Sequence, residues 1–353
     1  MIKIRFVKKD DYKKLKSLFN NNSIKIMSKI NWLNMWRNPY LKQKGKLGYV
    51  LVIKKKIVAH IGFYPCKYFL KKIKYNSLVL HSLVVEKKYR SVSILLIKKF
   101  FFSQKADFII STTTSELAGK ILKAFGMKKL SIKSLDESRI IILNYFKFSK
   151  FILKSNQYFL KKIIFLSTFY LLYLVKKLFK KNRLSSAKKI NLFDNKYNKF
   201  WDTYLNNSNN FNLDRNKNYQ NWFLRKKIIS KEAWVFVIKK NDEIVGYSST
   251  VIKKKNDFKI ALLTDLVALN EDENILKDLV AANIKELEKK NCIYFELANS
   301  SFKKYKIFQL FNSLSIKWKK NGFYYKSNNS NLNKLLKKNF YWSTTSLDGD
   351  IAV

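Results

Sequence analysis

The chain has 353 residues, of which 47% are apolar and 16% aromatic, enough to build the packed cores of two ordinary domains. Only 8 glycines and 2 prolines occur, which excludes collagen-like and proline-rich disordered proteins. Lys and Arg together exceed Asp and Glu by 48 charges, yet only seven of the 72 basic residues are Arg. Because Lys is spread along every segment, we interpret the charge as mainly compositional. The pattern disfavours nucleic-acid binding, and attraction to an anionic partner or membrane stays an alternative.

The two cysteines, Cys66 and Cys292, lie far apart, and the chain has no CxxC motif or Cys/His cluster. This pattern predicts neither a metal site nor a disulfide framework. The first residues, MIKIRFVKKDDYKKL, lack the apolar core of a signal peptide. We therefore expect a cytoplasmic protein.

The first 135 residues alternate between strand and helix patterns. Short β-branched and aliphatic runs predict strands, and segments with helix-type periodicity or helix-initiation signals predict helices. The predicted strands are 2–7, 48–53, 57–69, 75–85 and 107–113, and the predicted helices are 10–20, 28–37, 93–102 and 115–125.

The last 160 residues follow a similar order. The predicted helices are 193–205, 217–225, 273–289 and 302–314, and the predicted strands are 233–239, 243–251, 258–269, 292–297, 316–319 and 322–325. Two halves with one element order suggest a tandem duplication. We predict an α/β (α+β) fold with two domains, each a mixed, mostly antiparallel sheet flanked by helices. The predicted parts are 1–135, a connector 136–192, a second domain 193–340 and a tail 341–353.

The connector contains an apolar run, IIFLSTFYLLYLV at 163–175, with two lysines on either side. Thirteen residues are too few to cross a bilayer, which needs about 20. The favoured interpretation is a buried or inter-domain helix. The alternative is a helix in the membrane interface, with the lysines of 158–180 on anionic headgroups at the inner face of the membrane.

One stretch carries a recognisable motif, LVVEKKYRSVSIL at residues 83–95, where a predicted strand leads directly into a helix. Downstream, a strand and a helix are followed by Gly126-Met127. This arrangement resembles the GNAT superfamily of acyl-CoA-dependent N-acyltransferases, over the first half of the chain and more weakly over the second. Ser93 and Leu95 stand where the family has small residues, glycine or alanine.

The resemblance implies that acetyl-CoA or another acyl-CoA is the co-substrate. In the family, backbone N–H groups at the helix N-terminus bind the pyrophosphate, because orphan donors and the helix dipole favour an anion there. The strand before the turn pairs with the pantetheine arm, and one of its N–H groups polarises the thioester carbonyl. The residues matching these roles are Val84 and Val85 on the strand, and Arg90, Ser91, Val92, Ser93 and Ile94 at the turn.

An amine acceptor must lose a proton, so a general base is expected near the thioester. His81 is the candidate base and Glu86 the alternative; structural roles remain open for both. If the turn before this strand centres near Lys72, His60 lies opposite Val84, and the two imidazoles are about 10 Å apart. The family often has a Tyr that protonates the leaving thiolate, and this position is Leu122 here.

In the second half, the matching junction carries Glu271, Asp272 and Glu273. These carboxylates stabilise a helix N-terminus and repel a pyrophosphate, so we expect this half not to bind CoA. It would instead shape the acceptor cleft. The residues expected to contact a polar acceptor, with core-capping roles as the alternative, are Asp265, Glu296 and Asn299.

The tail contains Trp342, Asp348 and Asp350, side chains that suit carbohydrate recognition, and loosely resembles endings of acyltransferases from bacterial surface-polysaccharide clusters. A frayed terminus is the alternative. The predicted function is transfer of an acetyl or other acyl group from acyl-CoA to an amine, on an amino sugar or nucleotide sugar for surface polysaccharide. The alternative is a non-catalytic binding or membrane-surface module on a decayed acyltransferase fold.

Overall fold

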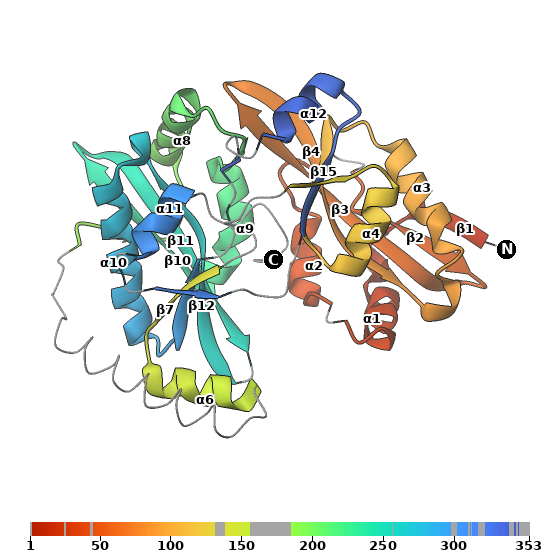
Figure 1. Ribbon diagram of the computed structural model, residues 1–353, viewed down its shortest axis with the longest axis horizontal. Coiled ribbons are helices and arrows are strands. Elements are labelled where there is room, and N and C mark those ends of the chain that lie inside the picture. Colours follow the sequence, from red (N-terminus) through yellow and green to blue (C-terminus); the bar gives the residue numbers. More distant parts are fainter. Residues whose placement is uncertain are drawn as a thin grey trace.

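The computed structural model describes most of the chain, arranged as two sheet-and-helix halves that lie side by side (Figure 1). The described residues are 2–24, 26–42, 45–130, 138–155, 185–255, 257–297, 302–309, 311, 313–316, 322–338, 342, 343 and 345. The apolar run 163–175 lies outside them. Within the described residues, no helix combines the length and apolar character needed to cross a membrane.

The first half follows the predicted order of elements closely. Its strands are β1 (Ile2–Phe6), β2 (Gly48–Ile53), β3 (Lys56–Leu70), β4 (Ile73–Val85), β5 (Phe108–Thr114) and β6 (Lys128–Leu130). Its helices are α1 (Tyr12–Asn21), α2 (Lys29–Met35), α3 (Ser93–Ser103) and α4 (Glu116–Ala124). Local signals explain several boundaries: Ser115 caps α4 through its side chain, and Lys71 and Lys72 take the left-handed backbone of the β3–β4 turn.

The second half repeats this order. Its strands are β8 (Lys188–Ile190), β10 (Ala233–Lys240), β11 (Glu243–Lys255), β12 (Phe258–Ala268), β13 (Tyr294–Leu297) and β14 (Leu314–Ile316). Its helices are α6 (Tyr145–Ser155), α8 (Asn195–Asn207), α9 (Lys217–Ile229), α10 (Glu273–Lys289) and α11 (Phe302–Gln309). Asp194, Asn216 and Asp272 cap α8, α9 and α10, so polar residues fix where these helices begin.

Each sheet also contains strands from outside its own half of the chain. The first sheet has the order β1-β2-β3-β4-β5-β15-β6, in which β15 (Gly322–Lys326) comes from the end of the chain, and the short β9 (Asn212–Leu213) also pairs with β3. The second sheet has the order β14-β7-β13-β12-β11-β10-β8, in which β7 (Ser138–Ile142) comes from the first part of the chain. In Figure 1 the blue β15 accordingly lies among the orange and yellow elements.

This exchange corrects one expectation. We expected the last two strands to complete the second half, but β15 pairs with β5 and β6 of the first sheet. A strand pattern specifies which face of a strand is buried, not which distant strand it joins, so the sequence carried no signal for the exchange. The division into 1–135 and 193–340 stays a prediction, and the sheets do not follow it strictly.

One hydrophobic core joins the halves. It contains Leu15 and Tyr64 from the first half together with Tyr197 and Tyr247 from the second. Polar contacts cross the same boundary, because Asn34 Nδ2 donates to the carbonyl of Trp222 at 3.0 Å and Trp222 Nε1 donates back to Asn34 at 2.7 Å. α12 (Ser330–Leu336) contributes Leu332 to this core. With a shared core and exchanged strands, the halves form one packed unit.

Candidate functional site

Strands β4 and β5 pair over only part of their length. Their parallel register covers three pairs, Ser77 to Val79 against Phe108 to Ile110. Beyond these pairs β4 runs on to Val85, and β5 runs on to Thr114 with β15 on its other edge. Among the described strands, none pairs with this last part of β4 on the β5 side. Its backbone groups are therefore the ones that an extended ligand could pair with.

The turn after β4 leads into a helix N-terminus that no side chain caps. The short 3-10 helix η2 (Lys87–Tyr89) is followed by α3, whose N-cap residue, Val92, makes no side-chain cap hydrogen bond. Arg90 and Ser91 are exposed. Ser93 is buried and its hydroxyl donates to the carbonyl of Arg90 at 2.6 Å, which ties the turn together. Open N–H groups beside a cation favour an anion.

Two apolar side chains at this turn point away from the core. Ile94 is 48% exposed and Leu95 is 45% exposed. Leu95, which stands at a small-residue position of the motif, therefore does not fill the sheet interior. Apolar contact with a ligand at the turn would remove both side chains from water.

The matching junction of the second half is closed by a carboxylate. Asp272 Oδ1 accepts from the N–H groups of Asn274 at 2.9 Å and Ile275 at 3.2 Å, at the start of α10. Two further acidic side chains flank this cap: Glu271 ends the preceding 3-10 helix η3 (Leu269–Glu271), and Glu273 is the first residue of α10. The expectation that acidic side chains stabilise this helix N-terminus is confirmed by the Asp272 cap, and the expectation that this half does not bind CoA stays a prediction.

The two histidines lie closer together than expected. His60 is opposite Val84, as predicted, but a β-bulge at residues 82 and 83 places His81 opposite Gly62. A Cβ atom on Gly62 would lie 2.6 Å from His81 Cε1 and 3.0 Å from His60 Cε1, so both rings lie against this glycine. The expected 10 Å separation is wrong because the bulge adds one residue and moves His81 onto the face of His60.

Both imidazoles sit in a largely dry environment. His81 is 9% exposed, its Nδ1 is 2.8 Å from Ser82 Oγ, and its ring packs on Tyr64. His60 is 2% exposed, and its Nδ1 is 3.1 Å from the carbonyl of Ser82. Burial, together with the neighbouring His81, lowers the pKa of His60 to about 3, so His60 is uncharged at neutral pH.

Glu86, the alternative base, is engaged at the end of β4. Its backbone N–H donates to the carbonyl of Val58 at 2.9 Å, and its carboxylate forms an ion pair with Lys56 at 2.6 Å. The residue is 8% exposed. As a base, Glu86 would have to release Lys56 before it could take a proton.

The second half contains a buried polar network that the sequence analysis did not find. Arg215 and Asp265 are fully buried and form an ion pair with Nε 3.3 Å from Oδ2. Tyr247 donates its hydroxyl hydrogen bond to the same Asp265 oxygen, and Gln220 donates to Tyr247 at 2.9 Å. The sequence offered one signal for this network: Arg is rare in a chain whose basic residues are almost all Lys, so each Arg, including Arg215, is a candidate for a specific role. Asp265 thus caps a core charge, the role given above as its alternative.

The other expected acceptor residues are dispersed. Glu296 is half-buried on β13, opposite Leu262 of β12, and Asn299 lies outside the described residues. Trp342 is 4% exposed and packs between Phe211 and Phe323 in the shared core, which contradicts its expected stacking on a sugar. The tail around it is anchored, because Arg215 donates to the carbonyl of Ser343 at 3.2 Å. Asp348 and Asp350 lie outside the described residues.

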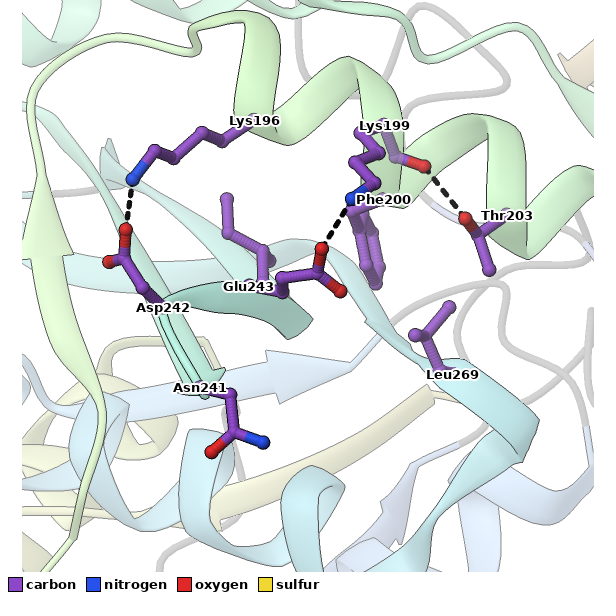
Figure 2. Close-up of a pocket in the computed structure, with 9 residues that line it drawn as sticks. Lys196, Lys199, Phe200, Thr203, Asn241, Asp242, Glu243 and Leu269 are labelled. Atoms are coloured by element: carbon purple, nitrogen blue, oxygen red, sulfur yellow. Dashed lines mark hydrogen bonds and ion pairs between the residues drawn. The ribbon is translucent and has the colours of Figure 1, made fainter.

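A cavity of about 290 Å³ opens in the second half between α8 and the β10–β11 hairpin (Figure 2). Lys196 pairs with Asp242 and Lys199 pairs with Glu243 across it, over an apolar floor that includes Phe200. None of the predicted site residues lines it. Among the described residues no cluster of three His, Cys, Asp or Glu side chains could hold a metal ion.

Comparison with known proteins identifies the fold and nothing closer. No family model matches the sequence, and no curated protein matches it. Among solved structures, Saccharomyces cerevisiae N-myristoyltransferase with bound myristoyl-CoA is similar with a TM-score of 0.59 at 13% identity, over 92% of this chain and 78% of that one. A GCN5-related N-acetyltransferase from Anabaena variabilis gives 0.59 at 10% identity, over 93% and 73%.

A third structure, a putative acetyltransferase from Pyrococcus horikoshii, gives a TM-score of 0.56 at 11% identity over 98% of this chain and 95% of that one. All three alignments cover both halves of the chain. The predicted two-domain GNAT-like fold is confirmed: this chain has the fold of GCN5-related acyltransferases, in a tandem arrangement.

Proposed function

We propose that the protein is an acyl-CoA-dependent N-acyltransferase whose co-substrate binds in the first half. Its fold is the one seen in the acyltransferases above, one of which holds myristoyl-CoA. The observation that carries the proposal is local: the unpaired end of β4 leads directly to the uncapped N-terminus of α3, beside Arg90. The second half has the same strand and helix, but Asp272 occupies the equivalent place.

The pyrophosphate of CoA would lie at the start of α3. The backbone N–H groups at this helix N-terminus, which no side chain caps, would bind it, and the Arg90 guanidinium would supply a charge-assisted partner. The pantetheine arm would extend along Val84 and Val85, whose edge toward β5 has no partner strand in the described chain. This extended pairing places the thioester next to the bulge that positions His81.

The reaction at this place is attack of an amine nitrogen on the thioester carbonyl carbon. The C–N bond forms, the C–S bond breaks, and CoA leaves as a thiolate that takes a proton from solvent. His81 accepts the proton that the amine loses, because it is the imidazole on the β4 bulge and His60 is held neutral behind it. Leu122, 2% exposed, cannot protonate the thiolate.

The acceptor is an amine, and an amino sugar or nucleotide sugar is the finer proposal. Its support is the resemblance of the tail, reduced by the burial of Trp342 in the core. A non-catalytic module on the same fold is the second candidate. The observation that favours it is the combination of Leu122 and Leu95 at positions where catalysis and close phosphate approach would use other residues.

The test is release of free thiol from acetyl-CoA with a panel of amines that includes amino sugars. The proposal predicts turnover of acetyl-CoA with at least one amine. In His81→Ala, kcat should fall on the order of 10²-fold while the affinity for CoA is retained. Arg90→Glu should instead raise KM for acetyl-CoA. The matched control is Lys13→Glu, the same charge reversal on the exposed face of α1. CoA binding without turnover of any amine would favour the non-catalytic module.

A further inference from the structure

A larger cavity, of about 590 Å³, lies at the far end of α9 in the second half. It is bounded by the last turn of α9, the edge strand β8 and the start of β10. This volume falls in the range of small-molecule sites, roughly 300–1,000 Å³. The cavity shares no lining residue with the CoA site proposed above.

Its charge is of one sign. Four basic residues line it, Lys189, Arg225, Lys231 and Lys290, and no Asp or Glu does. Only Lys189 has an ion pair, with Glu286 at 3.2 Å; the other three side chains form none within the described chain. Cations gathered without counter-ions favour an anion between them.

Arg225 stands out among these cations. Arg5, Arg139 and Arg215 each bind protein groups, namely Asp11, Ser313 and Asp265. Arg225 is exposed at the cavity, and its planar fork matches a phosphate or carboxylate. Helix capping does not require it, because the backbone N–H groups of Ser230 and Lys231 already satisfy carbonyls of the last turn of α9.

The remaining lining is apolar and unusually exposed. Ile229 is 72% exposed, the second-largest exposure among the large apolar side chains of the described residues, and Leu192 is 49% exposed. Ile228 and Trp234 also line the cavity, and Trp234 is 1% exposed. An apolar chain laid on Leu192, Ile228 and Ile229 would remove this surface from water.

We propose that this cavity binds an anionic amphiphile, a phosphate or carboxylate head attached to an acyl or alkyl chain. Arg225, Lys231 and Lys290 hold the head, and Leu192, Ile228 and Ile229 contact the first part of the chain. Such a ligand arises either as a free molecule or as a lipid in a bilayer, and both present the same chemistry to the cavity. The proposal goes beyond the acyltransferase activity and does not depend on it.

The test compares dodecyl phosphate below its critical micelle concentration with inorganic phosphate, by isothermal titration on the full chain. Dodecyl phosphate should bind the wild type at least tenfold more tightly than phosphate. The double variant Arg225→Glu/Lys231→Glu should bind dodecyl phosphate at least tenfold more weakly than the wild type. Lys13→Glu/Lys16→Glu, the same charge change on exposed positions of α1, should stay within twofold. Ile229→Ser should weaken the binding of dodecyl phosphate and leave the binding of inorganic phosphate unchanged.

Co-sedimentation with vesicles of phosphatidylglycerol in phosphatidylcholine separates the two sources. If the Arg225/Lys231 double variant loses binding both to the vesicles and to dodecyl phosphate, the bilayer presents the ligand. If it loses binding only to dodecyl phosphate, the ligand is a free molecule. Equal losses in the two double variants would mean that the overall positive charge alone attracts the amphiphile and would overturn the proposal. Dodecyl phosphate binding no more tightly than phosphate would overturn it as well.

Discussion

In the first half, β4 leads into a helix whose N-terminus no side chain caps, whereas in the second half β12 leads into a helix that Asp272 caps. Both strands pair with their parallel neighbour over three residues, and within the described residues each then continues without a partner on that edge. The backbone arrangement is therefore the same, and the two turns differ in whether a side chain caps the helix that follows. Under the proposal, the two halves share one backbone arrangement, and the side chains at the turn restrict the CoA site to the first half.

The centres of the two sheets differ in the same sense. At the bulge of β4 the first half has His81, with His60 across the pair of strands. At the bulge of β12 the second half has Asp265, which Arg215 neutralises inside the core. One sheet thus has two imidazoles beside its bulge, and the other has a buried ion pair beside its bulge. This contrast can be tested residue by residue.

The largest effect is expected from breaking that ion pair. Arg215→Met leaves the Asp265 carboxylate buried without its cation, so the free energy of unfolding should fall by about 3–5 kcal/mol. Urea denaturation followed by circular dichroism measures it. Arg225→Met, which removes an exposed arginine without an ion pair, is the control and should change stability little. A loss as small as the control's would mean that the network does not stabilise the second half.

The first half should respond to a carboxylate placed at its open turn. Ser91→Asp puts an acid one residue before the N-cap of α3 and should weaken CoA binding on the order of tenfold by repulsion. Ser91→Asn, the uncharged isostere, should bind nearly as well as the wild type. If both variants bind CoA equally, the phosphates do not lie at this turn.

His60 should make stability depend on pH. Its pKa is about 3 in the folded protein and near 6.5 when unfolded, so below pH 6.5 the unfolded chain binds a proton that the folded chain does not. Stability should therefore fall by about 1.4 kcal/mol for each pH unit from 6.5 toward 3, relative to His60→Gln. Parallel stability curves for the two proteins would show that His60 is protonated in the fold.

The smallest effect is expected at the closed turn. Asp272→Ala removes two cap hydrogen bonds from α10 and should lower the free energy of unfolding by about 1 kcal/mol. Its CoA affinity should equal that of the wild type, because the remaining carboxylates of Glu271 and Glu273 still disfavour a phosphate. Thermal denaturation and titration with CoA measure the two quantities on one sample.

Much of this architecture could be predicted from the sequence. The order of strands and helices in the first half, the opposition of His60 and Val84, and the acidic turn of the second half all follow from local patterns. Local chemistry sets these features: alternation of apolar residues, caps and turn residues. They hold in the fold because tertiary packing does not oppose them.

The features that could not be predicted depend on long-range pairing. β15 carries an ordinary strand pattern, and only the complete fold selects β5 and β6 as its partners. At the bulge, Ser82 has a positive φ angle. Glycine at this position would have indicated such a conformation in the sequence, whereas serine does not. The polar residues around Trp342 in the sequence predict an exposed tail, yet the Trp342 side chain packs in the core that the two halves share.

The central claim, that one half of the duplicated fold binds CoA and the other does not, is tested most directly by the stoichiometry of CoA binding. Isothermal titration of the wild type, Asp272→Ala and Arg90→Glu gives the number of sites and the affinity of each. We predict one CoA per chain for the first two proteins, and binding weakened on the order of tenfold or more for Arg90→Glu. Two sites per chain, or unchanged binding in Arg90→Glu, would contradict the account.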